Sequence, residues 1–287
     1  NIFMGMTESP VLIKNYLPTM NRSEIFLVMV SGMGTIAGSV MGTYIGMLGG
    51  TDPAAKVLFA THLLSASVMA VPGSIVLAKM LCPQTEEATD HVAISGKEKE
   101  NSNILDAISS GTVTGVKLMT NIAAMLLVFI SLVALANYIT EGVIGRYTGL
   151  NDWIVKITDG KAQGLTFQFI LGVITSPFMW LIGVPSQDIM LVGSLLGQKT
   201  ILNEFVAYFQ LQQWKDAGLF MYEKSILMST YILCGFANIS SIGILLGGLG
   251  VLAPEKRGLI SRIGLPAMIG GALVSVLSAT IIGMILG

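Results

Sequence analysis

The sequence has little charge, little histidine and little cysteine, and each shortage excludes a class of protein. Asp, Glu, Lys and Arg make up only 11% of the 287 residues, whereas soluble domains contain about 25%. The cysteines, Cys82 and Cys234, lack the spacing of a zinc site or a disulfide framework. The histidines, His62 and His91, have no metal partner at ligand spacing. A formal net charge of −1 provides no basic surface for a phosphate backbone, so no polynucleotide partner is expected.

Hydrophobic residues are abundant instead. They make up 53% of the chain, glycine occurs 33 times, and the mean hydropathy is +0.74. Because a spanning helix needs about 20 mainly apolar residues, these values predict an integral membrane protein with several spans. The candidate spans are 24–49, 57–81, 118–138, 165–184, 225–250 and 265–287.

Two of these spans are interrupted. Residues 31–39 (SGMGTIAGS) and 235–243 (GFANISSIG) combine helix-weakening glycine with hydroxyls and an amide. Such stretches unwind inside a membrane only where they line protein or water. Both spans are therefore predicted to be discontinuous helices.

Two polar islands carry carboxylates, Glu8 within 5–10 and Glu204 within 203–205. An acid inside a membrane costs about 3 kcal/mol on insertion scales and is by default a site for a substrate, an ion or a proton. The structural alternative is that each acid pairs with a buried amide or hydroxyl to fix a helix break. No lysine or arginine lies within either island, which weakens that alternative.

The islands and the interrupted helices occur in the same order twice. Residues 186–214 are too short and too polar for two spans, so they predict a re-entrant hairpin with Glu204 at its tip. Residues 1–17 resemble the second arm of an equivalent hairpin, and its first arm is expected in a preceding segment. In each half of the chain, the hairpin tip is followed by an interrupted helix and then by an uninterrupted one: Glu8, 31–39 and 57–81 in the first half, and Glu204, 235–243 and 265–287 in the second. We predict an all-α membrane protein with inverted repeats, re-entrant hairpins and discontinuous helices, of the kind found in secondary transporters.

Three regions are predicted along the chain. Residues 1–81 form the first repeat and 165–287 the second. Residues 82–164 hold a solvated charged loop (83–104), an amphipathic segment (104–117) and a scaffold helix. The modest bias of lysine and arginine places that loop in the cytoplasm and the C-terminus outside.

Polar groups near the islands predict what is bound. Glu204 and Glu8 accept hydrogen bonds from hydroxyl-rich or amide-bearing molecules, and Asn238 and Ser241, three residues apart, share one helix face. Two acids facing one cavity repel an anion, so a neutral polyhydroxylated or a cationic substrate is favoured. Phe236 either stacks on a planar ring or packs in the core.

A cation site is a second candidate. Asn1, Thr35 and the carbonyls freed at 35–36 are hard oxygen donors suited to a small monovalent cation. Alternatively, Thr35 bonds back to its own helix. Serine, histidine and aspartate are not placed to form a hydrolase triad, so no enzymatic activity is expected. A channel or receptor that lacks stoichiometric coupling stays open as another class.

Four ordered motifs resemble the concentrative nucleoside transporters, over nearly the whole chain and corresponding to that family's C-terminal two thirds. They are GMTESP at 5–10, GTIAGSV at 34–40, GQK at 197–199 leading to NEFVAY at 203–208, and GFANISS at 235–241. The resemblance implies a homotrimer in the plasma membrane, which the compact loops suggest is a bacterial inner membrane. It also implies cation-driven nucleoside uptake by an elevator-like movement of a transport domain.

Site residues are carried over from the resemblance position by position. It implies that the ribose hydroxyls are bound by Glu204, Asn238 and Ser241. It implies that the nucleobase is faced by Met6, Thr7 and Glu8, with Phe236 and Val40 packed beside it. It also implies that sodium is held by Asn1, Thr35 and the backbone of Met4 and Ile36. Met6 stands where the family usually has glutamine, so a hydrogen bond to the base is lost and a modified nucleoside becomes an alternative substrate. Proton coupling through Glu8 or Glu204 is the alternative to sodium.

Overall fold

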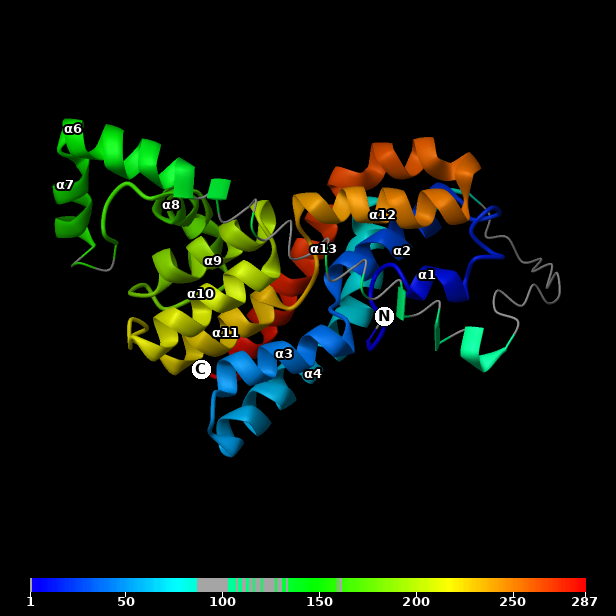
Figure 1. The fold of residues 1–287 in the computed structure, drawn as a ribbon, viewed down its shortest axis with the longest axis horizontal. Helices are drawn as coiled ribbons and strands as arrows, with labels where there is room; N and C mark the ends of the chain where they lie inside the picture. The colour runs from blue at the N-terminus through cyan, green and yellow to red at the C-terminus, as the bar shows by residue number, and fades with distance from the viewer. Residues whose placement is uncertain are drawn as a thin grey trace. The chain divides into compact units, whose positions relative to one another are not determined.

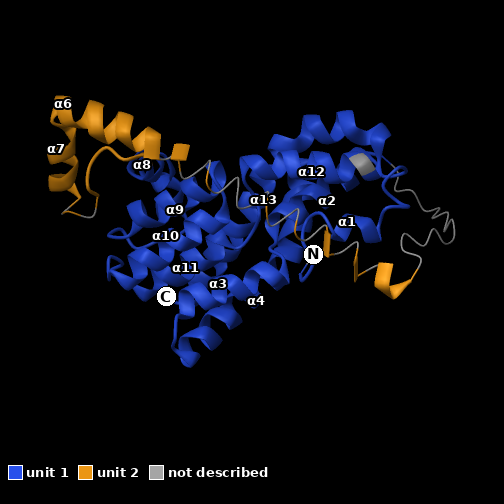
Figure 2. Cartoon of the chain, viewed as in Figure 1, with its two compact units in different colours: residues 1–92, 168–287 blue, residues 93–167 orange. Residues whose placement is uncertain are grey.

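The computed structural model describes residues 2–86, 134–158, 160 and 162–287, with isolated residues between 103 and 132, and among these residues the regular elements are all helices. The prediction of an all-α protein is thereby confirmed. The chain forms two compact units, 1–92 with 168–287 and 93–167 (Figure 2). The larger unit includes the first predicted repeat and the second from residue 168 onward, whereas residues 165–167 belong to the smaller unit.

The helices of the first predicted repeat are α1 Ser9–Leu12, α2 Arg22–Gly34, α3 Gly38–Gly49 and α4 Pro53–Leu81. Those of the second are α8 Phe167–Leu181, α9 Ile189–Ile201, α10 Glu204–Asp216, α11 Glu223–Leu233, α12 Ile239–Leu252, the short 3₁₀ helix η2 Pro254–Lys256 and α13 Arg257–Ile285 (Figure 1).

Both predicted helix interruptions are present. Helix α2 ends at Gly34, Thr35 is extended, and α3 begins at Gly38. Helix α11 ends at Leu233, and α12 begins after its N-cap Asn238. Glycine and polar side chains in these stretches disfavour a continued helix and supply a cap for the next one. The prediction of discontinuous helices is confirmed.

Within the residues that the structure describes, three helical segments are long and apolar enough to cross a membrane: Arg22–Gly49, Pro53–Leu81 and Pro254–Ile285. The first two match the predicted spans closely. The last begins earlier than the predicted start at 265: α13 itself begins at Arg257, about two helical turns before, and continues through Pro266. Helices α9 and α10 pack against each other as a hairpin, whereas its re-entrant position in a bilayer stays a prediction.

The two helix breaks lie against each other on α13. Gly235 has a φ of 153°, and a Cβ on it would lie 3.0 Å from Met33 O and 2.9 Å from Ser275 Oγ. A Cβ on Gly271 of α13 would lie 2.7 Å from the Met33 Cβ. Glycine at both places lets the ends of α2 and α11 approach α13 closely.

The smaller unit contains the π-helix η1 Tyr138–Gly145 and the short helices α6 Arg146–Thr148 and α7 Leu150–Ile157. Asn151 ties this unit together, since its Nδ2 donates to Glu141 O at 3.0 Å and its Oδ1 accepts from Leu165 N at 3.0 Å. Most of the predicted charged loop, amphipathic segment and scaffold span lies outside the described residues.

Candidate functional site

Glu204 is the buried acid around which the site is built. It is the first residue of α10, directly after Asn203, whose Oδ1 accepts from Val206 N at 2.9 Å and caps the helix. The positive end of a helix dipole favours a carboxylate at this position. Only 7% of the residue is exposed, so its oxygens need partners inside the protein.

Two side chains from the interrupted helices supply those partners. Asn238 Nδ2 donates to Glu204 Oε2 at 3.1 Å, and Tyr44 Oη donates to Oε1 at 3.3 Å. Asn238 lies at the start of α12, and Tyr44 lies on α3. The carboxylate therefore links the α9–α10 hairpin to both interrupted helices, through α3 and through the start of α12.

Asn238 has a second role as the N-cap of α12. Its Oδ1 accepts from Ser241 N at 2.9 Å, from Ser241 Oγ at 3.0 Å and from Ser240 Oγ at 2.6 Å. With its oxygen committed to the helix, only its NH₂ group faces Glu204. The structure thus brings together the three residues predicted to bind hydroxyls, Glu204, Asn238 and Ser241.

Tyr44 was not among the predicted site residues. Its ring stacks on Tyr208 with 4.0 Å between centroids, and Tyr208 Oη donates to Thr230 O at 2.8 Å. A buried tyrosine hydroxyl normally finds a hydrogen-bond partner. A tyrosine within a predicted span therefore signals a buried hydrogen bond at Tyr44, although it does not identify Glu204 as the partner.

Phe236 and Val40 lie on the two breaks beside this network. Val40 packs on the core cluster that includes Tyr44 and Tyr208. Phe236 is partly buried and packs against both core clusters of the larger unit. Its position satisfies the core-packing interpretation and leaves part of the ring uncovered.

The first polar island lies against α2 and α12. Met6 is buried, and a Cβ on Gly32 of α2 would lie 3.1 Å from the Met6 Cβ; a Cβ on Gly248 of α12 would lie 3.7 Å from Thr7 Cγ2. Glu8 is exposed, and no hydrogen bond joins it to Glu204. The two acids therefore have different environments, one enclosed and one open.

Two of the predicted sodium ligands, Thr35 and Ile36, lie where α2 ends. Gly38 N donates to Phe3 O at 2.9 Å, which holds the first residues of the chain at the start of α3. Thr35 Oγ1 donates to Ser31 O at 2.9 Å, the bond to its own helix considered above. A hydroxyl that donates its proton keeps its oxygen lone pairs, so this geometry fits a cation ligand as well. Ile36 is buried, Met4 is exposed, and Asn1 lies outside the described residues.

Two further charged residues are buried and were not among the predicted site residues, Asp188 and Lys199. Asp188 accepts from Met221 N at 3.0 Å and from Tyr222 N at 3.1 Å, which satisfies its carboxylate with backbone amides and fixes the chain before α11. Lys199, five residues before Glu204, is fully buried on α9. Asp188 is thus structural, whereas the role of Lys199 is taken up below.

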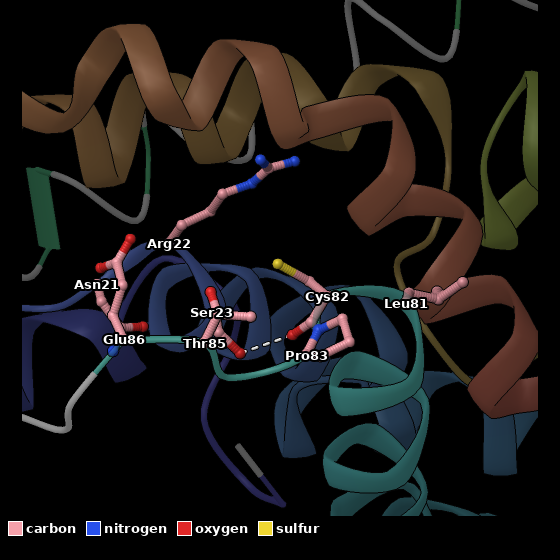
Figure 3. A pocket seen from close by; sticks show the side chains of 8 residues that line it. All are labelled: Asn21, Arg22, Ser23, Leu81, Cys82, Pro83, Thr85 and Glu86. Atoms are coloured by element: carbon pink, nitrogen blue, oxygen red, sulfur yellow. Dashed lines mark hydrogen bonds between the residues drawn. The ribbon is translucent and has the colours of Figure 1, made fainter.

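A cavity of about 300 Å³ is found elsewhere, at the start of α2 and the end of α4 (Figure 3). Its lining residues are Asn21, Arg22, Ser23, Leu81, Cys82, Pro83, Thr85 and Glu86. The Ser23 hydroxyl donates to Cys82 O at 2.6 Å and accepts from Lys79 Nζ at 2.9 Å. None of the predicted binding residues lines this cavity.

Comparison with known proteins identifies the family. The family described as "Na+ dependent nucleoside transporter C-terminus" matches residues 62–283. The chain is 39% identical to an uncharacterized transporter of Haemophilus influenzae over 100% of this chain and 64% of that protein. It is 38% identical to the nucleoside permease NupC of Helicobacter pylori (100% and 63%) and 39% identical to sodium/nucleoside cotransporter 1 of Rattus norvegicus (99% and 43%).

Solved structures agree with the relatives. CNTnw in an inward-facing substrate-bound state superimposes with a TM-score of 0.83 at 36% identity, covering 99% of this chain and 62% of that one. A CNTnw variant in an outward-facing state gives a TM-score of 0.85 at 36% identity, with coverage of 99% and 63%. The chain spans less than two thirds of the length of these relatives. By sequence and by fold, it belongs to the concentrative nucleoside transporter family.

Proposed function

We propose that the protein imports nucleosides through a membrane, driven by a sodium gradient, with alternating access by an elevator-type movement. The observation that carries this proposal is the buried network of Glu204, Asn238 and Ser241 between two interrupted helices. A carboxylate with two oxygens accepts hydrogen bonds from both vicinal hydroxyls of a ribose, and the amide and hydroxyl beside it add a donor and acceptors. Neighbouring hydroxyls are the feature that separates a nucleoside from a free base.

The remaining predicted residues are assigned to the base and to the coupling ion. Met6, Thr7 and Glu8 face the base, with Phe236 and Val40 packed beside it. Sodium is held by Asn1, Thr35 and the backbone of Met4 and Ile36, where freed carbonyls and hydroxyl oxygens suit a small cation. Proton coupling is the alternative.

The setting proposed for this machinery is a homotrimer that crosses the bacterial inner membrane several times. The support is the family membership together with the three long apolar helices of the described chain. No resident cofactor takes part in the proposed transport.

Uptake of labelled uridine and adenosine into proteoliposomes of the full-length protein tests the proposal. Sodium and proton gradients are imposed in parallel, at equal membrane potential. Accumulation above the external concentration with the sodium gradient alone is the expected result. Accumulation with the proton gradient alone would mean that the coupling ion is a proton instead of sodium. Uptake that stops when the internal and external nucleoside concentrations are equal would favour a channel. If free ribose inhibits the labelled uptake and no nucleoside does, the substrate is not a nucleoside.

Met6→Gln is expected to change substrate preference and not the basic transport step. A thioether cannot donate and accepts poorly, whereas a glutamine amide can do both towards a base edge. One added neutral hydrogen bond is worth about 1 kcal/mol, or roughly 5-fold in KM. Measured over a panel of pyrimidine, purine and modified nucleosides, KM should fall for some bases while the maximal rate stays similar. If the KM values of the whole panel are unchanged, Met6 does not contact the base.

Tyr44→Phe is expected to raise the KM for uridine by roughly 5-fold, because the lost hydrogen bond to Glu204 is long at 3.3 Å and so contributes only about 1 kcal/mol. The ring and its stacking on Tyr208 stay in place. Tyr208→Phe is the matched control, since its hydroxyl bonds to Thr230 O instead. That control should lower the thermal stability in detergent and leave KM unchanged. Equal KM values for both variants and the wild type would exclude Tyr44 from positioning Glu204.

A further inference from the structure

Lys199 is a charged side chain buried without a carboxylate partner. It is 0% exposed, and its Nζ donates to Ile232 O at 2.7 Å and to Ser275 Oγ at 3.0 Å. Within the described part of the chain it forms no ion pair. Burying an ammonium group is costly unless oxygen atoms replace its hydration shell. Here a carbonyl and a hydroxyl provide that replacement.

These oxygens belong to the second helix break. Ile232 is in the last turn of α11, where the final four carbonyls lack partners within the helix. Ser275 Oγ, which accepts from Lys199, donates in turn to Cys234 O at 3.0 Å. The end of α11 also carries the negative pole of the helix dipole. Lys199 thus occupies a site of the kind that binds a cation at a broken helix.

The first helix break has no such lysine among its predicted ligands. Helix α2 ends at Gly34 as α11 ends at Leu233, and the groups proposed for sodium there are neutral, Asn1 and Thr35. Asn1 precedes Glu8 by seven residues and Lys199 precedes Glu204 by five, so both stand shortly before a tip acid in the predicted repeats. In the stretch before each acid, the first repeat thus has a neutral amide and the second has an ammonium group.

We propose that the Lys199 ammonium is a tethered cation, which takes at the second helix break the place that the coupling sodium takes at the first. The carrier then needs one free cation per cycle where two equivalent breaks would otherwise need two. Lys199 is a positioning residue, since it acts on the helix end and touches no substrate. This inference rests on the sodium coupling proposed above.

The test is the sodium dependence of uridine uptake by Lys199→Gln in the full-length protein. For the wild type, we expect one sodium per uridine, from parallel fluxes of isotopic sodium and labelled uridine, and a Hill coefficient of about 1. In Lys199→Gln, uptake should fall several-fold at the wild-type half-saturating sodium and recover at high sodium, with the Hill coefficient rising toward about 2. The amide oxygen of glutamine and the freed carbonyl then hold the second ion.

Two controls separate charge from packing. Ser275→Ala removes one hydrogen bond of the ammonium and keeps its charge, so it should leave the Hill coefficient unchanged even if thermal stability falls. Lys215→Gln makes the same chemical change at a partly exposed pair with Asp216 and should behave as the wild type.

Several outcomes would overturn the proposal. A normal sodium curve for Lys199→Gln would do so, as would a lower maximal rate with an unchanged Hill coefficient, which indicates a purely structural lysine. Two sodium ions per uridine in the wild type would overturn it without any variant, and this measurement decides if Lys199→Gln does not fold. Wild-type uptake without any sodium dependence would instead refute the proposed coupling ion, and this inference with it.

Discussion

Uridine uptake by the Glu204→Gln variant is expected to fall at least about 100-fold, because each of two hydrogen bonds to a charged carboxylate contributes about 1.5–3 kcal/mol. Glutamine has nearly the same shape but only one acceptor oxygen, and its NH₂ group faces the donors of Asn238 and of the substrate. Initial rates in proteoliposomes and equilibrium uridine binding in detergent measure the loss. Both should fall together, since the lost contacts hold the substrate itself.

Glu223→Gln is the matched control. Glu223 is also an acid in the first turn of a helix, α11, but it is exposed. Both Glu204→Gln and Glu223→Gln therefore remove a negative charge from the start of a helix, but only Glu204→Gln removes the proposed substrate contact. Uptake by Glu223→Gln should stay within about 2-fold of the wild type, the range of a weak surface contact. Normal uptake by Glu204→Gln would refute the role of this carboxylate.

The discontinuous helices could be predicted from the sequence because their causes are local. Glycine with hydroxyls and an amide at 31–39 and 235–243 weakens a helix wherever the chain lies in space. Asn238 could also be foreseen, since an asparagine that starts an apolar run is a helix cap. The structure shows it capping α12 through Ser241.

The partners of Glu204 could not be predicted fully, because they depend on how distant segments pack. Tyr44 lies 160 residues away from Glu204 in the chain, and nothing in its neighbourhood marks it as a partner of that acid. Lys199 lies close in sequence, but its hydrogen bonds reach Ile232 and Ser275, 33 and 76 residues away. Two acids read as equivalent in the sequence, Glu8 and Glu204, differ in exposure: Glu204 is buried between Tyr44 of α3 and Asn238 at the start of α12, whereas Glu8 is exposed.

The second large effect is expected from Asn238→Asp. Aspartate retains the oxygen that accepts from Ser241 N and Ser241 Oγ, so α12 keeps its cap. It loses the NH₂ group that donates to Glu204 Oε2 at 3.1 Å and places a second carboxylate there instead. The lost bond alone contributes about 1.5–3 kcal/mol, and like-charge repulsion adds to it. Uridine affinity, measured by titration of the detergent-solubilised protein, should fall at least about 10-fold.

Asn238→Ala distinguishes the two roles of this side chain. It removes the donor to Glu204 without adding charge, and it also removes the cap of α12, which typically contributes about 1 kcal/mol. If the amide acts on Glu204, Asn238→Asp binds uridine more weakly than Asn238→Ala, while Asn238→Ala is the less thermally stable variant. The reverse order in binding would mean that Asn238 serves the site only by starting α12. The order of two variants at one position therefore tests whether Asn238 acts by direct contact with the carboxylate or through the helix.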